Sequence, residues 1–268
     1  MLPSDFLIRY RSHQNSSPET QSIGQPDDRI SFLALRPGHD TKNFFFFSGY
    51  FDYARHISAE WSVYAMDCPH EVLVGKDGID AVLLADRCIA AMKAIQEKGP
   101  YRIGGYCFGA LIAHSTAARL QIRGEQVTSL ILVEPPSPPG ILPKSSDFIF
   151  RYLHFVRNML AHGRRSLSAT LRNRWQRYFH LYKPDKKPRI VNLSAYFSTN
   201  IFLGVIVVIL ANNTYHRLSP RRDPRLAWHR LASKGIQIIE MSGDHVTCCR
   251  SPHVVVLASI INRILRRY

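Results

Sequence analysis

Cysteine, glutamate and histidine at three places in the chain have the side chains that nucleophilic catalysis needs. The first is Cys107, the centre of Gly105-Tyr106-Cys107-Phe108-Gly109, which has the pattern G-x-C-x-G. In this pattern the nucleophile sits on a sharp turn between a strand and a helix, and the flanking glycines permit the turn because they lack a Cβ. The pattern predicts a cysteine raised above a sheet edge, where the N-terminus of the following helix favours its thiolate. A buried structural cysteine in a glycine-rich turn is the alternative.

The segments on both sides of Cys107 provide the context that this pattern requires. Pro100 to Gly104 predicts a short strand, and Ala110 to Leu120 is an apolar run with helical spacing. Such a turn directs the Phe108 amide toward the place where a tetrahedral intermediate carries its oxyanion. Gly49 follows a predicted aromatic strand and can supply a second amide, but an ordinary turn glycine explains Gly49 equally well.

A thiol nucleophile needs a base, and the histidine that serves as base needs an acceptor that orients it. The sequence contains 12 histidines, so a histidine alone indicates little. His245 is favoured because it follows the last predicted strand, Ile236 to Glu240, in a Ser-Gly-Asp-His loop. We therefore expect His245 to be the base that deprotonates Cys107.

The orienting carboxylate is expected to be Glu134. This residue ends the apolar strand Val127 to Val133, and two prolines follow it. A carboxylate at that position can reach the imidazole from the side opposite the nucleophile. Asp223 and Asp244 remain alternatives, although Asp244 adjoins His245 and neighbours in a loop rarely point at each other. Asn212 and Asn213, rather than a carboxylate, follow the next predicted strand, which favours Glu134.

Strands and helices alternate along most of the chain. This alternation predicts an α/β fold with a doubly wound, mostly parallel sheet and helices on both faces. The predicted strands are Ile30 to Leu35, Asn43 to Phe47, Trp61 to Met66, Pro100 to Gly104, Val127 to Val133, Ile201 to Leu210 and Ile236 to Glu240. The predicted helices are Ile79 to Glu97, Ala110 to Leu120, Arg225 to Lys234 and Pro252 to Arg266. Cys88 lies on the apolar face of the first helix and is expected in the core.

Two segments interrupt the alternation. Residues 1–28 are polar and are interpreted as a flexible leader or linker, which leaves 29–268 as the folded domain. Residues 140–196 predict amphipathic helices inserted as a lid, and basic residues greatly outnumber acidic ones there. The basic residues form either a solvated helix face or a docking surface for an acidic partner.

Composition bounds the class of protein. The 268 residues suit one domain with an insertion, and 46% of them are hydrophobic, as in globular proteins with a sizeable core. Five cysteines without a C-x-x-C pair argue against a disulfide framework or a zinc site and favour reduced thiols in a cytoplasm. We expect no metal, because the cysteines lack the spacing of a metal site, and no membrane span, because no apolar run is long enough. We expect no nucleic acid, because no recognition motif accompanies the net charge of +15.

Several blocks of the chain resemble the thioesterase domains of non-ribosomal peptide and polyketide synthases, which have the α/β-hydrolase fold. The first, residues 99–109, is similar to the core GPYxLGGxSxG of that family, with Cys107 in place of serine. The second, residues 243–247, resembles the Gly-Asp-His block near the end of these domains. Residues 130–136 resemble the strand that ends in the triad aspartate, here Glu134. Residues 47–51 lack the family's His-Pro-Ala-Gly-Gly loop, which concerns the amide expected of Gly49.

This resemblance implies a thioesterase that releases an acyl or peptidyl chain from the phosphopantetheine of a carrier protein, by hydrolysis or by cyclisation. The chain order Cys107, Glu134, His245 is the order of that fold. No cofactor is implied beyond the phosphopantetheine that carries the substrate. Dienelactone hydrolases also contain G-Y-C-x-G, so a hydrolase of small esters or lactones is an alternative. A non-catalytic binding protein of the same fold is another.

Overall fold

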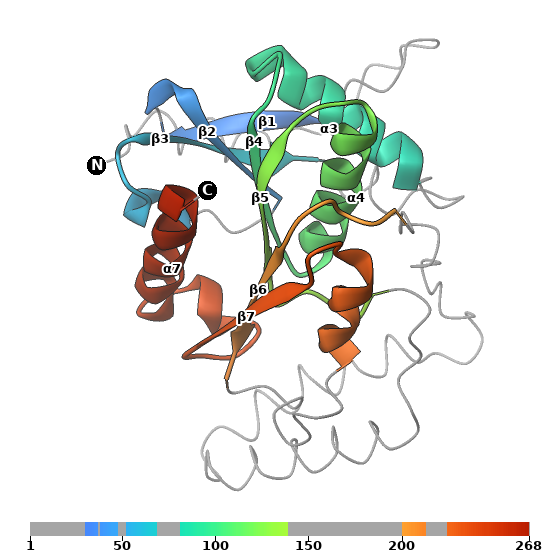
Figure 1. Ribbon diagram of the computed structural model, residues 1–268. Helices are drawn as coiled ribbons and strands as arrows, with labels where there is room; N and C mark the ends of the chain where they lie inside the picture. Colours follow the sequence, from blue (N-terminus) through green and yellow to red (C-terminus); the bar gives the residue numbers. More distant parts are fainter. Residues whose placement is uncertain are drawn as a thin grey trace, which may run out of the picture.

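Seven strands form one sheet at the centre of the protein (Figure 1). They are β1 (Ser31–Arg36), β2 (His39–Phe47), β3 (Trp61–Asp67), β4 (Tyr101–Tyr106), β5 (Val127–Val133), β6 (Ile206–Ala211) and β7 (Ile236–Met241). Their order is β1-β3-β2-β4-β5-β6-β7, and β1 pairs antiparallel to β3 while the other neighbours are parallel. The predicted mostly parallel sheet is therefore confirmed.

The computed structural model describes residues 30–36, 38–47, 52–68, 81–138, 200–212 and 224–267. The expectations for the leader 1–28, Gly49, the lid 140–196 and Asp223 lie outside these residues.

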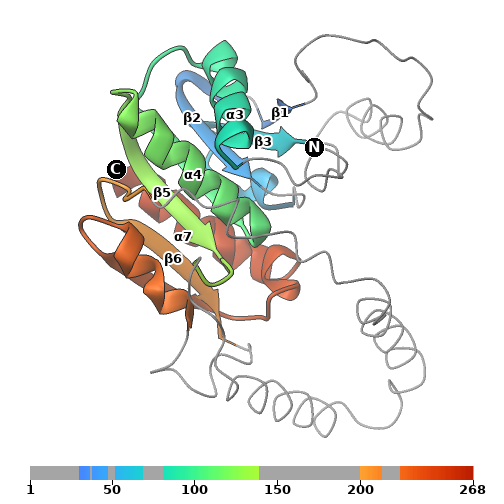
Figure 2. The ribbon, with the colours of Figure 1, turned by 90° about the vertical axis from the view of Figure 1, so that its right-hand side faces the viewer.

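Helices cover both faces of the sheet. Helices α3 (Ala81–Ile95) and α4 (Phe108–Ile122) lie on one face, and α7 (His253–Arg267) lies on the other with the short 3₁₀ helix η1 (Asp52–His56) (Figure 1). Figure 2 views the molecule from the α3 and α4 side. Two more 3₁₀ helices, η6 (Pro224–Leu231) and η7 (Thr247–Cys249), flank β7.

The four phenylalanines of β2 show how the sheet separates two cores. Side chains alternate between the faces of a strand, so Phe45 and Phe47 pack with the α3 and α4 core while Phe44 and Phe46 pack with the α7 core. All four are fully buried, and each contributes about 2–3 kcal/mol of hydrophobic free energy on an area basis. A strand that is apolar on both faces suits the interior of a parallel sheet.

The structure moves several of the predicted boundaries, and β2 begins four residues earlier than predicted, at His39. Strand β4 continues two residues beyond the prediction, to Tyr106, because Gly105 and Tyr106 pair with β5. Helix α4 begins at Phe108 rather than at residue 110. Strand β6 begins at Ile206 rather than at residue 201, because Phe202 instead makes an isolated bridge with Ala232, next to the end of η6.

No helix among the described ranges has the length and apolar character needed to cross a membrane. Cys88 on α3 is fully buried, which confirms the prediction that it belongs to the core. Burial raises the pKa of its thiol well above the ordinary range.

Candidate active site

Cys107 occupies the turn between β4 and α4 in a backbone conformation that side chains rarely adopt. Its φ is 53° and its ψ is −123°. Positive φ costs a non-glycine residue free energy, so the surrounding structure must hold the turn. Its amide donates to the Val133 carbonyl at 3.0 Å, and its carbonyl accepts from the Ala110 amide at 3.0 Å. The first bond joins the turn to β5 and the second joins it to α4, so the elements predicted around Cys107 fix its position.

The two glycines of the G-x-C-x-G pattern are required by close backbone contacts. A Cβ on Gly109 would lie 1.9 Å from the Phe47 carbonyl oxygen, and one on Gly105 would lie 2.4 Å from the Gly109 carbonyl oxygen. Real Cβ atoms do not approach a carbonyl this closely. The glycines thus let α4 start directly against the ends of β2 and β4, with Phe108 as its first residue.

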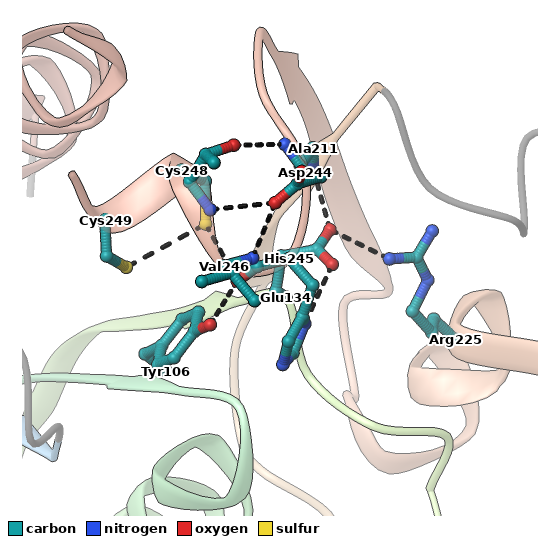
Figure 3. Close-up of polar contacts among 10 residues, drawn as sticks. Tyr106, Glu134, Ala211, Arg225, Asp244, His245, Val246, Cys248 and Cys249 are labelled. Atoms are coloured by element: carbon teal, nitrogen blue, oxygen red, sulfur yellow. Dashed lines mark hydrogen bonds and ion pairs between the residues drawn. The ribbon is translucent and has the colours of Figure 1, made fainter. Parts of the chain in front are cut away.

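Glu134 follows β5 and also has a positive φ, 46°. Its side chain is only 3% exposed. One carboxylate oxygen, Oε1, accepts the Ala211 amide at 2.7 Å and Nη1 of Arg225 at 2.9 Å (Figure 3). The Glu134 amide donates to the Ile209 carbonyl at 2.8 Å. Backbone and side chain are therefore both anchored to the end of β6.

The other carboxylate oxygen of Glu134 contacts His245. Nδ1 of His245 lies 3.1 Å from Oε2, so its N–H donates to the carboxylate (Figure 3). The Cys107 side chain is close enough to the imidazole to affect its titration. The pKa of His245 is raised to about 10, first by the interaction with Cys107 and then by that with Glu134, while partial burial acts in the opposite direction. The structure thus brings Cys107, His245 and Glu134 into one connected array.

Asp244, the alternative carboxylate, faces its own loop. Its Oδ1 accepts the amides of Val246 and Thr247, each at 2.8 Å, and its own amide donates to the Thr247 hydroxyl at 2.9 Å. Burial alone would raise the pKa of Asp244, but these N–H groups outweigh it and lower that pKa below its ordinary value. Asp244 therefore shapes the turn that presents His245.

Tyr106 provides a direct link between the two loops. Its hydroxyl donates to the backbone carbonyl of His245, and the two rings lie 5.3 Å apart between centroids (Figure 3). Because Tyr106 immediately precedes Cys107, the strand that ends at the nucleophile also holds the histidine loop. The sequence marked Tyr106 only as a variable position of the motif.

Accessibility separates the five free thiols. Cys88, Cys248 and Cys249 are buried, whereas Cys68 and Cys107 are partly exposed. Cys248 and Cys249 lie on η7 with their sulfur atoms 3.8 Å apart. The bond to Cys248, followed by burial, raises the pKa of Cys249 well above the ordinary range. Of the thiols in this region, Cys107 is the one placed for chemistry.

Arg225 is, besides Tyr106, a contact at this site that sequence reasoning missed. The chain contains 35 lysines and arginines, and nothing in the pattern around residue 225 indicates that this one is buried against a carboxylate. No group of three or more His, Cys, Asp or Glu side chains within the described ranges is arranged to hold a metal ion.

Comparison with known proteins places this geometry in a family context. The family model of the thioesterase domain matches residues 49–147, which include Cys107 and Glu134. The non-reducing polyketide synthase terA of Aspergillus terreus is 24% identical over 78% of this chain and 11% of the synthase. The chondramide synthase cmdD of Chondromyces crocatus is 25% identical over 78% of this chain and 6% of the synthase. The chain thus spans a small part of these relatives.

Solved thioesterase domains share the fold. The NocB thioesterase domain from the nocardicin cluster aligns over 90% of this chain and 100% of that domain, with a TM-score of 0.57 and 17% identity. The Vlm2 thioesterase domain aligns over 87% of this chain and 97% of that domain, with a TM-score of 0.55 and 20% identity. The α/β-hydrolase fold is therefore confirmed, and the chain is similar to the thioesterase domains of non-ribosomal peptide and polyketide synthases, as its sequence predicts.

Proposed function

We propose that the chain is a thioesterase that releases an acyl or peptidyl chain from the phosphopantetheine of a carrier protein through a Cys107 acyl-enzyme. The observation that carries this proposal is the position of His245, which is hydrogen-bonded to Glu134 and interacts with the Cys107 side chain. Nucleophile, base and orienting carboxylate in one array are what acyl transfer requires.

The first half of the reaction transfers the chain to Cys107. With the proton on His245, the Cys107 thiolate attacks the carrier thioester carbonyl and forms a new C–S bond. The tetrahedral oxyanion faces the first turn of α4, where Phe108 and the helix dipole stabilise negative charge. Collapse of this intermediate breaks the bond to the phosphopantetheine sulfur, which takes the proton from His245. The acyl-enzyme is again a thioester, so it remains activated.

The second half releases the chain. Once Cys107 is acylated its thiolate charge is gone, and so is the main influence that raises the pKa of His245. His245 is then able to accept a proton from the attacking nucleophile, and Glu134 stabilises the resulting imidazolium. Attack by water yields a free acid, and attack by an amine or hydroxyl of the chain itself yields a ring. In either case the Cys107 thiolate leaves and the array returns to its starting state.

The carrier protein is inferred from the relatives. Two of them, terA and cmdD, are named as synthases, and this chain matches only a small part of each. A release domain within such a synthase receives its substrate on a carrier domain, and we infer the same kind of partner for this chain.

Glu134 is assigned as the orienting carboxylate over Asp244 because Glu134 contacts the imidazole and Asp244 bonds the loop backbone.

Intact mass spectrometry with acyl-pantetheine thioesters tests the proposal. We expect a mass increase of one acyl group on the protein, located on the peptide that contains Cys107, and no increase in Cys107→Ala. Cys68→Ala is the matched control, because Cys68 is the other partly exposed thiol outside the array. Absence of any adduct together with tight binding of the thioester would instead favour a non-catalytic binding protein. Turnover of free lactones without turnover of thioesters would favour the small-lactone hydrolase.

A further inference from the structure

Arg225 and Glu134 form a buried ion pair directly behind the histidine. Their side chains are 5% and 3% exposed, and Nη1 of Arg225 lies 2.9 Å from Oε1 of Glu134 (Figure 3). Among the described residues, Glu134 and Arg225 are the buried side chains that carry formal charge. His114 is also buried, but burial lowers the pKa of its imidazole to about 4, so the ring is neutral. A buried pair of this kind needs a reason, because removing two charges from water is unfavourable.

The ion pair divides the carboxylate into two halves with different roles. Oε1 receives two donors, the Ala211 amide at 2.7 Å and Arg225 at 2.9 Å, whereas Oε2 is directed at Nδ1 of His245. Donors on Oε1 fix the rotation of the carboxylate plane, so they determine where Oε2 lies. Arg225 therefore influences the imidazole without contacting it.

The 3₁₀ helix that carries Arg225 is itself fastened to the segment after Glu134. Trp228, three residues along η6, is fully buried and donates its indole N–H to the Pro136 carbonyl at 3.0 Å. The ring of His114 from α4 packs edge-on against Trp228, with centroids 5.1 Å apart. Helix η6 thus holds residues 134–136 at two points, one charged and one neutral.

Charge supplies the second part of the argument. Within the described ranges, the other ionisable groups near the Glu134 and His245 pair are Cys107 at the turn before α4, Tyr106 from β4, Asp244 from the histidine loop, and Cys248 and Cys249 from η7. All of these are neutral or negative, and none of them can offset the charge of a buried carboxylate. Arg225 is thus the cation that pairs with this buried carboxylate whatever the state of the histidine, whereas His245 is a cation only while its ring holds both protons.

We propose that Arg225 is a positioning residue of the catalytic array, which aligns the Glu134 carboxylate and compensates its charge so that Glu134 stabilises the His245 imidazolium and with it the Cys107 thiolate. This inference rests on the proposed function. It adds a fourth member to the array, supplied by η6, and assigns to it an effect on proton location rather than contact with the substrate.

The test measures the alkylation rate of Cys107 by iodoacetamide across pH, with peptide mass spectrometry as the readout. In Arg225→Met we expect the pH of half-maximal alkylation to rise by about one unit and the rate at pH 7 to fall about tenfold, because the Glu134 carboxylate loses the partner that aligns it and stabilises the imidazolium less. Arg225→Lys retains a cation and should restore most of the rate. Arg230→Met, at an exposed arginine of the same 3₁₀ helix, should behave like the unaltered protein.

A double-mutant cycle separates positioning from packing. In a Glu134→Gln background there is no carboxylate charge for Arg225 to compensate. Adding Arg225→Met should therefore lower the alkylation rate of Cys107 by a factor of less than about two. Losses that multiply in the double variant, or an equal loss in Arg225→Met and Arg225→Lys without a change in pH profile, would overturn the inference in favour of a structural role. Direct repulsion between Arg225 and the imidazolium acts across the carboxylate in the opposite sense, so a downward pH shift would also overturn it.

Circular dichroism of each variant at the assay temperature checks that the fold is retained, and Arg225→Lys is the informative variant if Arg225→Met unfolds. A Cys107 that reacts no faster than Cys68 in the unaltered protein would overturn the proposed function, and this inference with it. A reactive Cys107 whose pH profile is the same in Arg225→Met would overturn the inference alone.

Discussion

The charge on Cys107, next to the His245 imidazole, changes during the proposed cycle. This change lets His245 act first as an acid and then as a base. Its pKa of about 10 in the resting protein is due first to Cys107 and next to Glu134. At neutral pH it is therefore an imidazolium, ready to protonate the departing phosphopantetheine thiolate. Acylation removes the first of these influences. A histidine whose pKa then falls toward the ordinary value of about 6.5 can accept the proton that release requires.

Removal of the Cys107 thiol should reproduce this change. In Cys107→Ala we expect NMR titration of His245 to show a pKa well below the value of about 10, because the interaction that raises it most is absent. The sign follows for stability as well. A raised folded-state pKa means that the ionised histidine stabilises the fold fully below about pH 6.5, and that this contribution is lost as the pH rises toward 10. That pH-dependent window should narrow in Cys107→Ala. An unchanged His245 pKa in the variant would contradict the contact between the two side chains.

The turn between β4 and α4 depends on Gly109 more than on any helix-forming preference of its sequence. Gly109→Ala should destabilise the protein by about 3 kcal/mol, because its Cβ would overlap the Phe47 carbonyl oxygen at 1.9 Å and would push α4 from the sheet. It should also slow alkylation of Cys107, since the start of α4 moves with it. Urea denaturation provides the measurement.

Gly124→Ala is the matched control for that variant. Gly124 differs from Gly109 in having a positive φ, 81°, and a Cβ there would have no atom within 4 Å. Its cost should be limited to backbone strain, about 1 kcal/mol. Equal destabilisation by the two substitutions would mean that the close approach of α4 to β2 does not constrain the turn between β4 and α4.

The elements show which parts of this fold could be predicted from sequence. Strand β5 was predicted to the residue, because a run of apolar residues ended by a charged one has an unambiguous edge. Strand β6 was predicted too long, because Ile201 to Leu210 is apolar throughout and periodicity cannot reveal that Phe202 bridges to Ala232 instead. Local pattern therefore identified the strands and α-helices of the described ranges but not the short 3₁₀ helices η1 and η7, and tertiary pairing determined where β6 begins.

The same division holds for the candidate site. Cys107 and His245 could be selected because a motif or a loop marks each of them. Glu134 could be selected because the ends of neighbouring parallel strands lie at the same sheet edge. Arg225 could not, since its burial results from η6 packing over the segment that follows Glu134, and that packing depends on Trp228 reaching Pro136. Contacts between an arginine and a carboxylate 91 residues apart leave no periodic signal.

At the scale of the whole molecule, the distribution of charge is the feature that the site does not explain. Residues 140–196 contain 12 lysines and arginines against two aspartates, a net +10 out of +15 for the chain. They fall between β5 and β6 in the chain. Glu134 directly follows β5, and Ala211, whose amide bonds the Glu134 carboxylate, ends β6. A positively charged insertion at this point of the sequence is suited to recognise an acidic partner that delivers a substrate to Cys107.

Charge reversal in this segment tests whether it receives a carrier protein. We expect a higher KM for carrier-bound acyl groups. We expect little change in KM for short free thioesters, because these need only Cys107 and His245. The substitutions are to glutamate at Arg164, Arg165, Arg172 and Arg174. The control carries the same change in net charge at exposed positions of the described chain, namely Arg230, Lys234, Arg263 and Arg267.

Ionic strength distinguishes docking from a general effect of charge. Exposed charges are screened beyond about 8 Å at physiological ionic strength, so the difference in KM between the unaltered protein and the 140–196 variant should shrink as salt is added. The control variant should show a smaller difference at every salt concentration, because its substitutions are not among residues 140–196. Steady-state kinetics with both substrates, at low and high salt, provide the measurement. Equal loss on carrier-bound and free thioesters would indicate damage to the fold, and unchanged carrier kinetics would leave these arginines as a solvated surface.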